Sequence, residues 1–539
     1  MPHMQDDFPL LMSTLYDHGV RHYPDQEIVS VDPDLAITRT TYAETDRRVR
    51  RLATAFSESL GVAAGDAVGT FAFNNHRHHE LYWATANTGV ICHTLNLRLF
   101  PEQLVYVINH GGDRVLFLDV NLAPLLAPII DELKFVERYV VMGGDAADSG
   151  LPDAISYEEM IDGVSEHGAW PVLDERSPFM LCYSSGTTGN PKGVAYTQRS
   201  TYLHTISNLA NFPIAATDNV LPVVPQFHAS AWGYPFQAVT MGAKLTYPGP
   251  DLSPEGLVKL FVDEKVTFSA GVPTVWLGIQ QYLADHPEIE LPDMRAFLCG
   301  GSAVPRAMTK WYQENRGIRV VQGWGMTETN PIASVSLLAP WMEDWDFEQQ
   351  LDIFETAGRI VPGLQYKIVD EDGEELPHDG EAFGELLIRG PWIAGEYYKD
   401  DRTPQSFVDG WLRTGDVCKV TPEGYIRITD RAKDLIKSGG EWISSIDLEN
   451  EIMAHPEVAE ATVVGLKHVK WQERPVAFVV RIEGSTVTAD DIIAFVTDRV
   501  AKWWIPDEIV FVDEIPKTGT GKFDKKVVRD QYSDLLMDA

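Results

Sequence analysis

The sequence predicts a multidomain α/β protein with a large N-terminal domain of α/β subdomains, a β-rich subdomain and a small α+β C-terminal domain. Three observations support this. The chain has 539 residues, too many for one hydrophobic core. Short apolar segments alternate with amphipathic ones through most of it, as in parallel sheets covered by helices. From Glu385 to Ile428 the pattern changes to short strands with turns, as in GELLIRG and GYIRITD.

The individual elements follow from hydrophobic periodicity. We expect helices over 8–22, 42–60 and 76–89. Apolar segments bounded by polar or glycine-containing turns predict strands over 27–30, 67–73, 90–95, 115–119, 139–142, 218–224, 244–247, 266–270 and 297–299.

Three histidines begin the third of these helices. Only His76 and His79 share a helical face with one another, His78 does not, and no third ligand is evident. The sequence therefore favours a solvated helix start over a metal site.

Composition excludes several functional classes. No apolar run reaches the roughly 18 residues that span a bilayer, and the opening MPHMQDDF lacks the features of a signal peptide, so a cytoplasmic location is expected. A formal charge of −35 opposes nucleic-acid or anionic-membrane binding as a main function. The four cysteines are widely spaced without a CxxC pair, which predicts reduced core residues and neither zinc nor disulfides.

The stretch Tyr183–Gly193, YSSGTTGNPKG, has the composition of a phosphate-binding loop. Its glycines allow close backbone approach to an anion, its hydroxyls are donors, and its lysine is a compact positive charge. The spacing differs from a P-loop, because Lys192 is followed by Gly193 and not by Ser or Thr. An ordinary Gly/Ser-rich turn is the alternative.

The loop resembles the signature of the adenylate-forming superfamily, which comprises acyl-CoA synthetases, luciferases and adenylation domains. Further motifs of that superfamily follow in order, namely GWGMTET, GWLRTGD, DRAKDLIKSGGEWIS and PKTGTGK. FHASAWG, KSGGEWIS and KWQERP make the chain most similar to medium- and long-chain fatty acyl-CoA synthetases and methylmercaptopropionate-CoA ligases.

The resemblance implies an ATP site and a magnesium site. Mg²⁺ needs few protein ligands because it keeps several waters, and Thr188 and Glu328 match its family ligands. The residues expected at ATP or AMP are Ser184, Ser185, Gly186, Thr187, Thr188, Gly189, Lys192, Gly301, Ser302, Gly323, Trp324, Gly325, Met326, Thr327, Asp416 and Arg431. Among them, Trp324 is expected against the adenine, Asp416 on the ribose hydroxyls, and Arg431 near the same sugar.

Lys522 is the expected catalytic lysine, with Glu328 and Arg431 as the other catalytic residues. A solvated terminal charge run is the alternative that composition alone favours. The resemblance divides the chain into a domain over 1–430, a hinge over 431–435 and a mobile domain over 436–539. The residues expected at the hinge or at coenzyme A are Lys433, Asp434, Lys437, Gly439, Gly440, Glu441 and Trp442.

The predicted acyl pocket consists of Phe227, His228, Trp232, Gly271 and Val272. His228 is equally compatible with a hydrogen-bonded core position. The chain is thus identified as an ATP- and CoA-dependent acyl-CoA synthetase for a medium- to long-chain fatty acid. The alternatives are a ligase for methylmercaptopropionate or another short or aryl acid, a module that loads a carrier protein, and a nucleotide-binding scaffold without chemistry. The resemblance also implies a homodimer.

Overall fold

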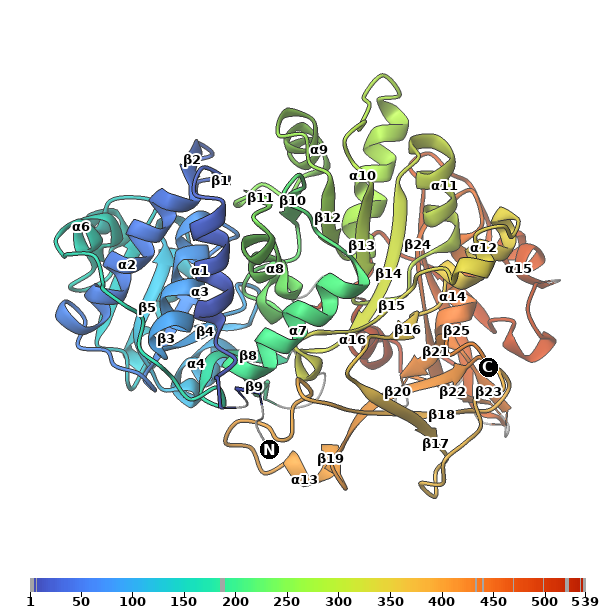
Figure 1. Cartoon of the computed structure of the whole chain (residues 1–539). Helices are drawn as coiled ribbons and strands as arrows, with labels where there is room; N and C mark the ends of the chain where they lie inside the picture. The colour runs from blue at the N-terminus through green and yellow to red at the C-terminus, as the bar shows by residue number, and fades with distance from the viewer. Residues whose placement is uncertain are drawn as a thin grey trace.

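The computed structural model describes residues 4–5, 7–184, 190–431, 434–438, 441–468, 470–497, 499–518, 523–533 and 535–536. Within them the strands form four sheets, which follow one another across Figure 1 from the N-terminal to the C-terminal part of the chain. This agrees with the α/β architecture, the β-rich region and the separate C-terminal region that the sequence predicts.

A seven-stranded sheet is built mainly from the N-terminal part of the chain. In spatial order its strands are β7 (Ile155–Ser156), β6 (Arg138–Met142), β5 (Asp113–Asp119), β3 (Ala67–Phe71), β4 (Ile91–Thr94), β8 (Pro178–Ser184) and β9 (Lys192–Thr197). All neighbours are parallel except β8 and β9, which form an antiparallel pair at one edge. The predicted phosphate loop therefore connects two adjacent strands.

A nine-stranded sheet lies beside it, coloured mostly green and yellow in Figure 1. Its order is β16 (Arg359–Ile360), β15 (Ile332–Val335), β14 (Arg319–Gly325), β13 (Ala296–Gly300), β12 (Phe268–Gly271), β10 (Asn219–Pro222), β11 (Lys244–Tyr247), β1 (Glu27–Val31) and β2 (Ile37–Thr41). The strands from β14 to β1 are parallel. Their carboxyl ends therefore share one edge, where ligands bind in open α/β sheets.

One hydrophobic core joins the two sheets. Buried side chains from both sheets pack with Tyr16, Trp83 and Phe236 of three helices. The rings of Tyr16 and Trp83 are 4.8 Å apart, and those of Trp83 and Phe236 are 5.3 Å apart. The helices before the β-rich region are α1 (Met12–His22), α2 (Tyr42–Glu58), α3 (His76–Thr88), α4 (Pro101–Gly111), α5 (Ala123–Leu126), α6 (Tyr157–Asp162), α7 (Gln198–Asn211), α8 (Tyr234–Met241), α9 (Pro254–Asp263), α10 (Pro273–Asp285), α11 (Arg306–Arg316) and α12 (Phe347–Phe354).

Two smaller sheets complete the described chain. The first contains β17 (Gln365–Val369), β18 (Phe383–Arg389), β19 (Phe407–Val408), β20 (Trp411–Val420) and β21 (Ile426–Arg431), with helix α13 (Thr403–Ser406). The second contains β22 (Ile436–Ser438), β23 (Glu441–Ile443), β24 (Val458–His468), β25 (Gln472–Arg481) and β26 (Glu508–Phe511), with α14 (Ser445–Met453), α15 (Ala489–Thr497) and α16 (Lys525–Gln531). The second sheet has its own buried core.

The histidines at the start of α3 correct the prediction of a solvated helix start. The helix does begin at His76, where the Asn75 side chain accepts from the His78 N–H at 3.0 Å, but all three rings are buried. Burial lowers the pKa of His78 to about 4 and that of His79 to about 3, so both rings are neutral. Among the described residues, no group of three or more His, Cys, Asp or Glu side chains is arranged to hold a metal ion.

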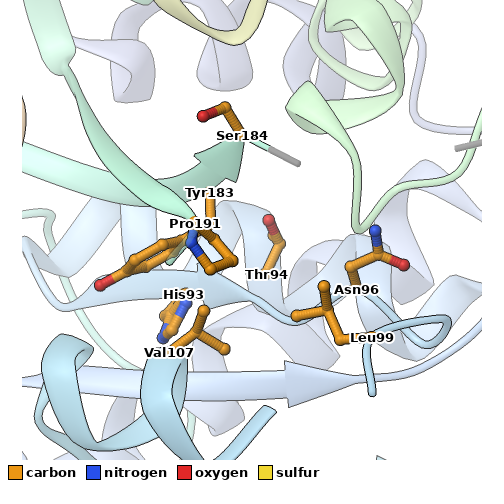
Figure 2. A pocket seen from close by; sticks show the side chains of 8 residues that line it. All are labelled: His93, Thr94, Asn96, Leu99, Val107, Tyr183, Ser184 and Pro191. Atoms are coloured by element: carbon orange, nitrogen blue, oxygen red, sulfur yellow. The ribbon is translucent and has the colours of Figure 1, made fainter. Parts of the chain in front are cut away.

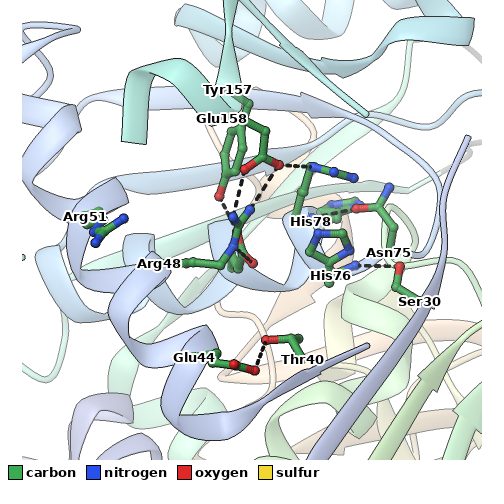
Figure 3. A network of polar contacts seen from close by, with 12 residues as sticks. Ser30, Thr40, Glu44, Arg48, Arg51, Asn75, His76, His78, Tyr157 and Glu158 are labelled. Atoms are coloured by element: carbon green, nitrogen blue, oxygen red, sulfur yellow. Dashed lines mark hydrogen bonds and ion pairs between the residues drawn. The ribbon is translucent and has the colours of Figure 1, made fainter. Parts of the chain in front are cut away.

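Helix α3 is packed against α2 and α6 by a network of polar contacts. Figure 3 shows Arg48 of α2 facing Glu158 and the Tyr157 ring, whose centre is 5.8 Å from the Arg48 guanidinium carbon. Arg48 Nε also donates to the fully buried carboxylate of Glu80 at 2.7 Å, and its two terminal nitrogens donate to Glu158. A buried ion-pair network thus fastens α3 between its neighbours. Sequence composition cannot reveal these ion pairs, because Arg48 and its partners Glu80 and Glu158 are far apart in sequence.

The four cysteines are all buried and free, as predicted. Among the described helices, none combines the length and the apolar character required to cross a membrane.

Candidate active site

A cavity of about 710 Å³ lies at the carboxyl edge of the nine-stranded sheet. Its wall includes residues that follow β10, β12, β13 and β14, together with the ends of β8 and β9 and residues of α14 and α16. Of the predicted site residues, the cavity brings together Ser184, Lys192, Phe227, His228, Trp232, Val272, Gly301, Ser302, Gly323, Gly325, Met326, Thr327, Glu328 and Asp434. Motifs whose residues are up to 250 positions apart, from Ser184 to Asp434, therefore meet at this cavity, where the carboxyl ends of the parallel strands lie.

The phosphate-loop hairpin enters this cavity from the seven-stranded sheet. Ser184 ends β8 and pairs with Lys192, which begins β9. The Lys192 ammonium lies 4.3 Å from the centre of the Tyr397 ring, and partial burial lowers its pKa. The predicted phosphate ligands Ser185, Gly186, Thr187, Thr188 and Gly189 lie outside the described residues. A lysine at this hairpin is suited to meet an anionic ligand.

A small cavity of about 10 Å³ underlies the end of β8. Figure 2 shows His93 and Thr94 of β4 and Asn96 beyond it facing Tyr183, Ser184 and Pro191. The fully buried His93 ring bonds through Nδ1 to the Asp113 carboxylate at 2.8 Å, and the Tyr183 hydroxyl and His110 Nδ1 are 2.6 Å apart. These contacts fix the strand that leads into the predicted phosphate loop.

The segment around Tyr397 and Arg402 covers the hairpin, and the sequence did not indicate it. The Tyr398 N–H donates to the Gly193 carbonyl at 2.8 Å, and Arg402 donates to the Asn190 carbonyl at 3.0 Å. Arg402 also pairs with Asp400, which holds the pKa of that carboxyl down at about 2. The pairing of Tyr398 with Gly193, 205 positions earlier, and the Arg402 contact with Asn190 place these residues at the site.

Glu328 is a buried carboxylate in the cavity wall, in the short 3-10 helix η5 (Thr327–Thr329). The Tyr397 hydroxyl donates to its Oε1 at 2.8 Å, and the Ala394 N–H donates to its backbone carbonyl at 2.8 Å. The carboxylate is thereby oriented while it still faces the cavity. An oriented carboxylate beside the predicted phosphate-loop hairpin fits Mg²⁺, which prefers oxygen ligands and needs few of them from the protein.

Trp324 and Asp416 are joined directly. Trp324 Nε1 donates to Asp416 Oδ2 at 2.8 Å, so the indole is tied to strand β20. Trp324 packs against the core of the β-rich sheet, and neither residue is part of the cavity wall described above. The expectation that Trp324 lies against the adenine is untested. Arg431 pairs with Asp416 along the neighbouring strand β21, which brings the backbones of two predicted ribose-site residues together.

The FHASAWG motif forms a left-handed turn in the apolar part of the wall. Ala229, Ser230, Ala231, Trp232 and Gly233 all have positive φ, between 44° and 81°. This conformation is unusual for residues with a side chain, and it directs Phe227, His228 and Trp232 to the cavity. Of the segment after β12, Val272, Pro273, Thr274 and Leu277 line the cavity.

Gly271, another residue of the predicted acyl pocket, is the last residue of β12. A β-carbon on Gly271 would come within 3.0 Å of the Trp276 indole, and Trp276 itself is buried and stacked on Phe297 at 3.7 Å. Gly271 is absent from the described cavity wall. It therefore packs behind the pocket, because β12 ends one residue before the chain turns towards the cavity.

Residues between Asp434 and Lys526, in the C-terminal part of the chain, also line the cavity. Thr518 and Phe523 line it, and they flank the predicted catalytic Lys522, which lies outside the described residues. Of the predicted hinge and CoA residues, Lys433, Gly439 and Gly440 are likewise outside them. Glu441 and Trp442 are placed by the backbone alone, in β23 opposite Ser438 and Lys437. Lys437 is exposed and away from the described cavity wall.

Comparisons with known proteins identify the family of this chain. The AMP-binding enzyme family model matches residues 16–398, and the AMP-binding enzyme C-terminal domain matches residues 447–522. The chain is 43% identical over 534 residues to a 3-methylmercaptopropionyl-CoA ligase of Ruegeria lacuscaerulensis, covering 98% of both chains. It is 39% identical to a medium-chain-fatty-acid–CoA ligase of Ectopseudomonas oleovorans, over 98% of this chain and 97% of the other.

A long-chain-fatty-acid–CoA ligase of Thermus thermophilus is 43% identical over 94% of this chain and 93% of its own. Among solved structures, the anthranilate CoA ligase AuaEII in complex with anthranoyl-AMP has a TM-score of 0.88 at 23% identity, over the whole of both chains, and supports the fold. The family matches cover most of the chain. The protein therefore belongs to the AMP-binding enzyme family and is an acid–thiol ligase.

Proposed function

We propose that this ligase is an ATP-dependent acyl-CoA synthetase that converts a medium- to long-chain fatty acid, ATP and CoA into acyl-CoA, AMP and pyrophosphate. The single observation behind this proposal is the shared cavity. It combines Lys192 of the phosphate-loop hairpin and the Glu328 carboxylate with the apolar wall at Phe227 and Trp232. A polar end for nucleotide and an apolar wall for an acyl chain are what such a reaction needs.

In the first half-reaction, a carboxylate oxygen of the acid attacks the α-phosphorus of ATP, and the bond to the departing pyrophosphate breaks. Lys192, Thr187 and Thr188 hold the β- and γ-phosphates, the lysine through its positive charge and the threonines through hydrogen bonds from their hydroxyls. Glu328 and Thr188 would hold Mg²⁺, which supplies further charge neutralisation when bound. Lys522 stabilises the charge that develops between the carboxylate and the α-phosphate.

In the second half-reaction, the sulfur of CoA attacks the acyl carbonyl, AMP departs, and the thiol proton is lost. We propose that the domain over 436–539 rotates about the hinge 431–435, chiefly at Lys433 and Asp434. The rotation withdraws Lys522 and brings the Gly439 and Gly440 segment to the carbonyl, with Lys437, Glu441 and Trp442 on the CoA side. The glycines leave room for the pantetheine arm.

The acid itself has two candidates. Relatives of similar identity are named for long-chain fatty acids and for 3-methylmercaptopropionate, so identity alone does not separate them. The large apolar part of the wall favours a fatty acid. A homodimer and a cytoplasmic location complete the proposal, and the buried free cysteines support the latter.

The test is carboxylate-dependent AMP release with Mg-ATP, across acids from acetate to palmitate plus 3-methylmercaptopropionate and cinnamate, each with and without CoA. We expect turnover only with CoA, with a maximum at one fatty-acid length. A maximum at 3-methylmercaptopropionate would support the second candidate. Adenylate that CoA cannot discharge would point to a carrier protein.

A substitution of Lys522 tests its proposed role separately. Lys522→Ala should lose adenylate formation and retain thioesterification of preformed acyl adenylate. Lys259→Ala is a matched control, because this exposed lysine of α9 pairs with Asp263 and is not part of the described cavity wall. Adenylate formation by Lys522→Ala at the wild-type rate would contradict the assignment.

A further inference from the structure

A cluster of charged side chains lies in the cavity wall where α14 and α16 meet strand β21. Asp430 near the end of β21 is 1% exposed, Ser445 begins α14, and Glu449 is one turn further along that helix. Lys525 is the first residue of α16, and its side chain is 14% exposed. Asp430, Glu449 and Lys525 all line the cavity.

The hydrogen bonds of this cluster have a defined direction. Lys525 Nζ lies 2.5 Å from Ser445 Oγ and 2.8 Å from Glu449 Oε1. An ammonium group only donates, so the Ser445 hydroxyl accepts from Lys525 and gives its own hydrogen to Asp430 Oδ2, at 2.6 Å. The Ser445 N–H donates to the same oxygen at 2.8 Å. Lys525 therefore orients the hydroxyl that binds Asp430.

In this cluster one ammonium group lies close to two carboxylates, and all three groups are largely buried. Burial opposes the charge of Lys525, but the carboxylates of Glu449 and Asp430 outweigh burial and raise its pKa. Glu449 also accepts from the Thr462 hydroxyl at 2.9 Å and the Val463 N–H at 2.7 Å. Removal of the cation would take a positive charge away from two buried carboxylates, which is costly.

The cluster also bridges the proposed hinge. Asp430 precedes residues 431–435, whereas Ser445, Glu449 and Lys525 follow them. Two further contacts lie beside it: the Ser444 hydroxyl donates to the Thr429 carbonyl at 2.5 Å, and Arg529 pairs with Asp434 at 2.5 Å. A rotation of residues 436–539 about Lys433 and Asp434 would separate Ser445 from Asp430.

The described residues on either side of 519–522, the segment that contains Lys522, are also held by contacts. Phe523 pairs with Lys517 in an isolated bridge, and Lys517 Nζ is anchored to Glu460 at 2.7 Å. Thr518 and Phe523, on either side of the undescribed residues 519–522, both line the cavity. Lys525 follows directly after Phe523 and Asp524, so its contacts with Ser445 anchor the C-terminal side of this segment.

We propose that Lys525 and Ser445 are positioning residues for the adenylate-forming half-reaction, because their contact with Asp430 holds the C-terminal part in the orientation in which Thr518 and Phe523 line the cavity. This inference rests on the proposed function. The contact acts on orientation and not on the reacting atoms, so its loss affects the two half-reactions unequally. Adenylation needs this orientation, whereas CoA attack needs the contact broken.

The experiment measures the two half-reactions separately in the full chain. Acid-dependent exchange of pyrophosphate into ATP reports adenylation, and CoA-dependent consumption of preformed acyl adenylate reports thioesterification. Ser445→Ala should reduce exchange about tenfold, as expected for loss of one hydrogen bond to a charged group, and leave thioesterification at or above the wild-type rate. Lys525→Met should do the same, and Lys525→Arg, which keeps a cationic donor, should restore exchange.

Ser485→Ala is the matched control, because its hydroxyl also donates to a carboxylate, that of Glu457 at 2.8 Å, but away from the cavity. It should leave both half-reactions unchanged. Asp430→Asn removes the charge at constant size and replaces Ser445→Ala if that variant fails to fold, as judged by circular dichroism and melting temperature.

Unchanged exchange in folded Ser445→Ala and Lys525→Met, or equal losses in both half-reactions, would overturn the inference. So would a failure of Lys525→Arg to exceed Lys525→Met. Wild-type protein without exchange for any acid in the panel would instead refute the proposed function, so the two failures are distinguishable.

Discussion

Asp119 is a buried polar residue whose hydrogen bonds reach, through Asn75, to Gln226 next to the cavity wall. Its fully buried carboxylate accepts from the Phe73 N–H at 2.8 Å and from Asn75 Nδ2 at 3.0 Å, and the Asn75 N–H donates to Gln226 Oε1 at 3.0 Å. Gln226 immediately precedes the cavity residues Phe227 and His228. Burial raises the pKa of Asp119 to about 7, despite these hydrogen bonds.

This shift predicts a pH-dependent effect of Asp119→Asn. The folded protein favours the protonated acid, so the stability that Asp119 contributes is full below about pH 4 and is lost as the pH rises to about 7. Asparagine does not ionise. The stability of the variant relative to wild type should therefore rise with pH, by at most about 1.4 kcal/mol per unit. Unfolding at pH 5, 6, 7 and 8 measures this, and a constant difference would contradict it.

At the residue scale, the sequence singles out Lys192, Glu328 and Phe227, and the structure shows that all three line one cavity. Each belongs to a motif that resembles one of the adenylate-forming superfamily. Tyr397 was missed, since its importance comes from contacts with Glu328 and Lys192, which lie 69 and 205 positions away. The buried His78 and His79 were misjudged for the same reason: their partners come from other elements.

At the scale of elements, most predicted strands and helices occur within a few residues of their expected bounds. The segments expected at 244–247 and 76–89 correspond to β11 (Lys244–Tyr247) and α3 (His76–Thr88). The left-handed turn at Ala229–Gly233 was not foreseen. Its sequence, with glycine only at the end, gives no local reason for positive φ, so packing around the cavity must maintain it.

This turn can be tested with two matched alanines. Ala231 in the turn has φ of 49°, and Ala238 lies within helix α8; both are 0% exposed. Each Ala→Gly change removes one buried methyl group, but glycine relieves the backbone only in the turn and weakens it in the helix. Ala231→Gly should therefore be more stable than Ala238→Gly by about 2 kcal/mol. Chemical denaturation compares them, and equal stability would argue against strain in the turn.

At the scale of the whole molecule, the net charge of the chain affects how readily the expected homodimer forms. Each chain has a formal charge of −35, so two copies repel one another at low ionic strength and approach more readily when salt screens them. Light scattering in 0.3 M salt should give twice the chain mass of 60.2 kDa, with more monomer at low salt and low concentration. A mass of 60.2 kDa under every condition would refute the dimer.

The sequence by itself determined the α/β class, the order of the motifs and the identity of the groups suited to nucleotide chemistry, because periodicity and loop composition are local properties. Only the tertiary structure decided that Tyr397 orients Glu328, that Gly271 packs behind the pocket, and that Lys525 joins Ser445 to Asp430 across the proposed hinge. These facts depend on how distant segments meet when the sheets pack, and on the need of buried charges for partners.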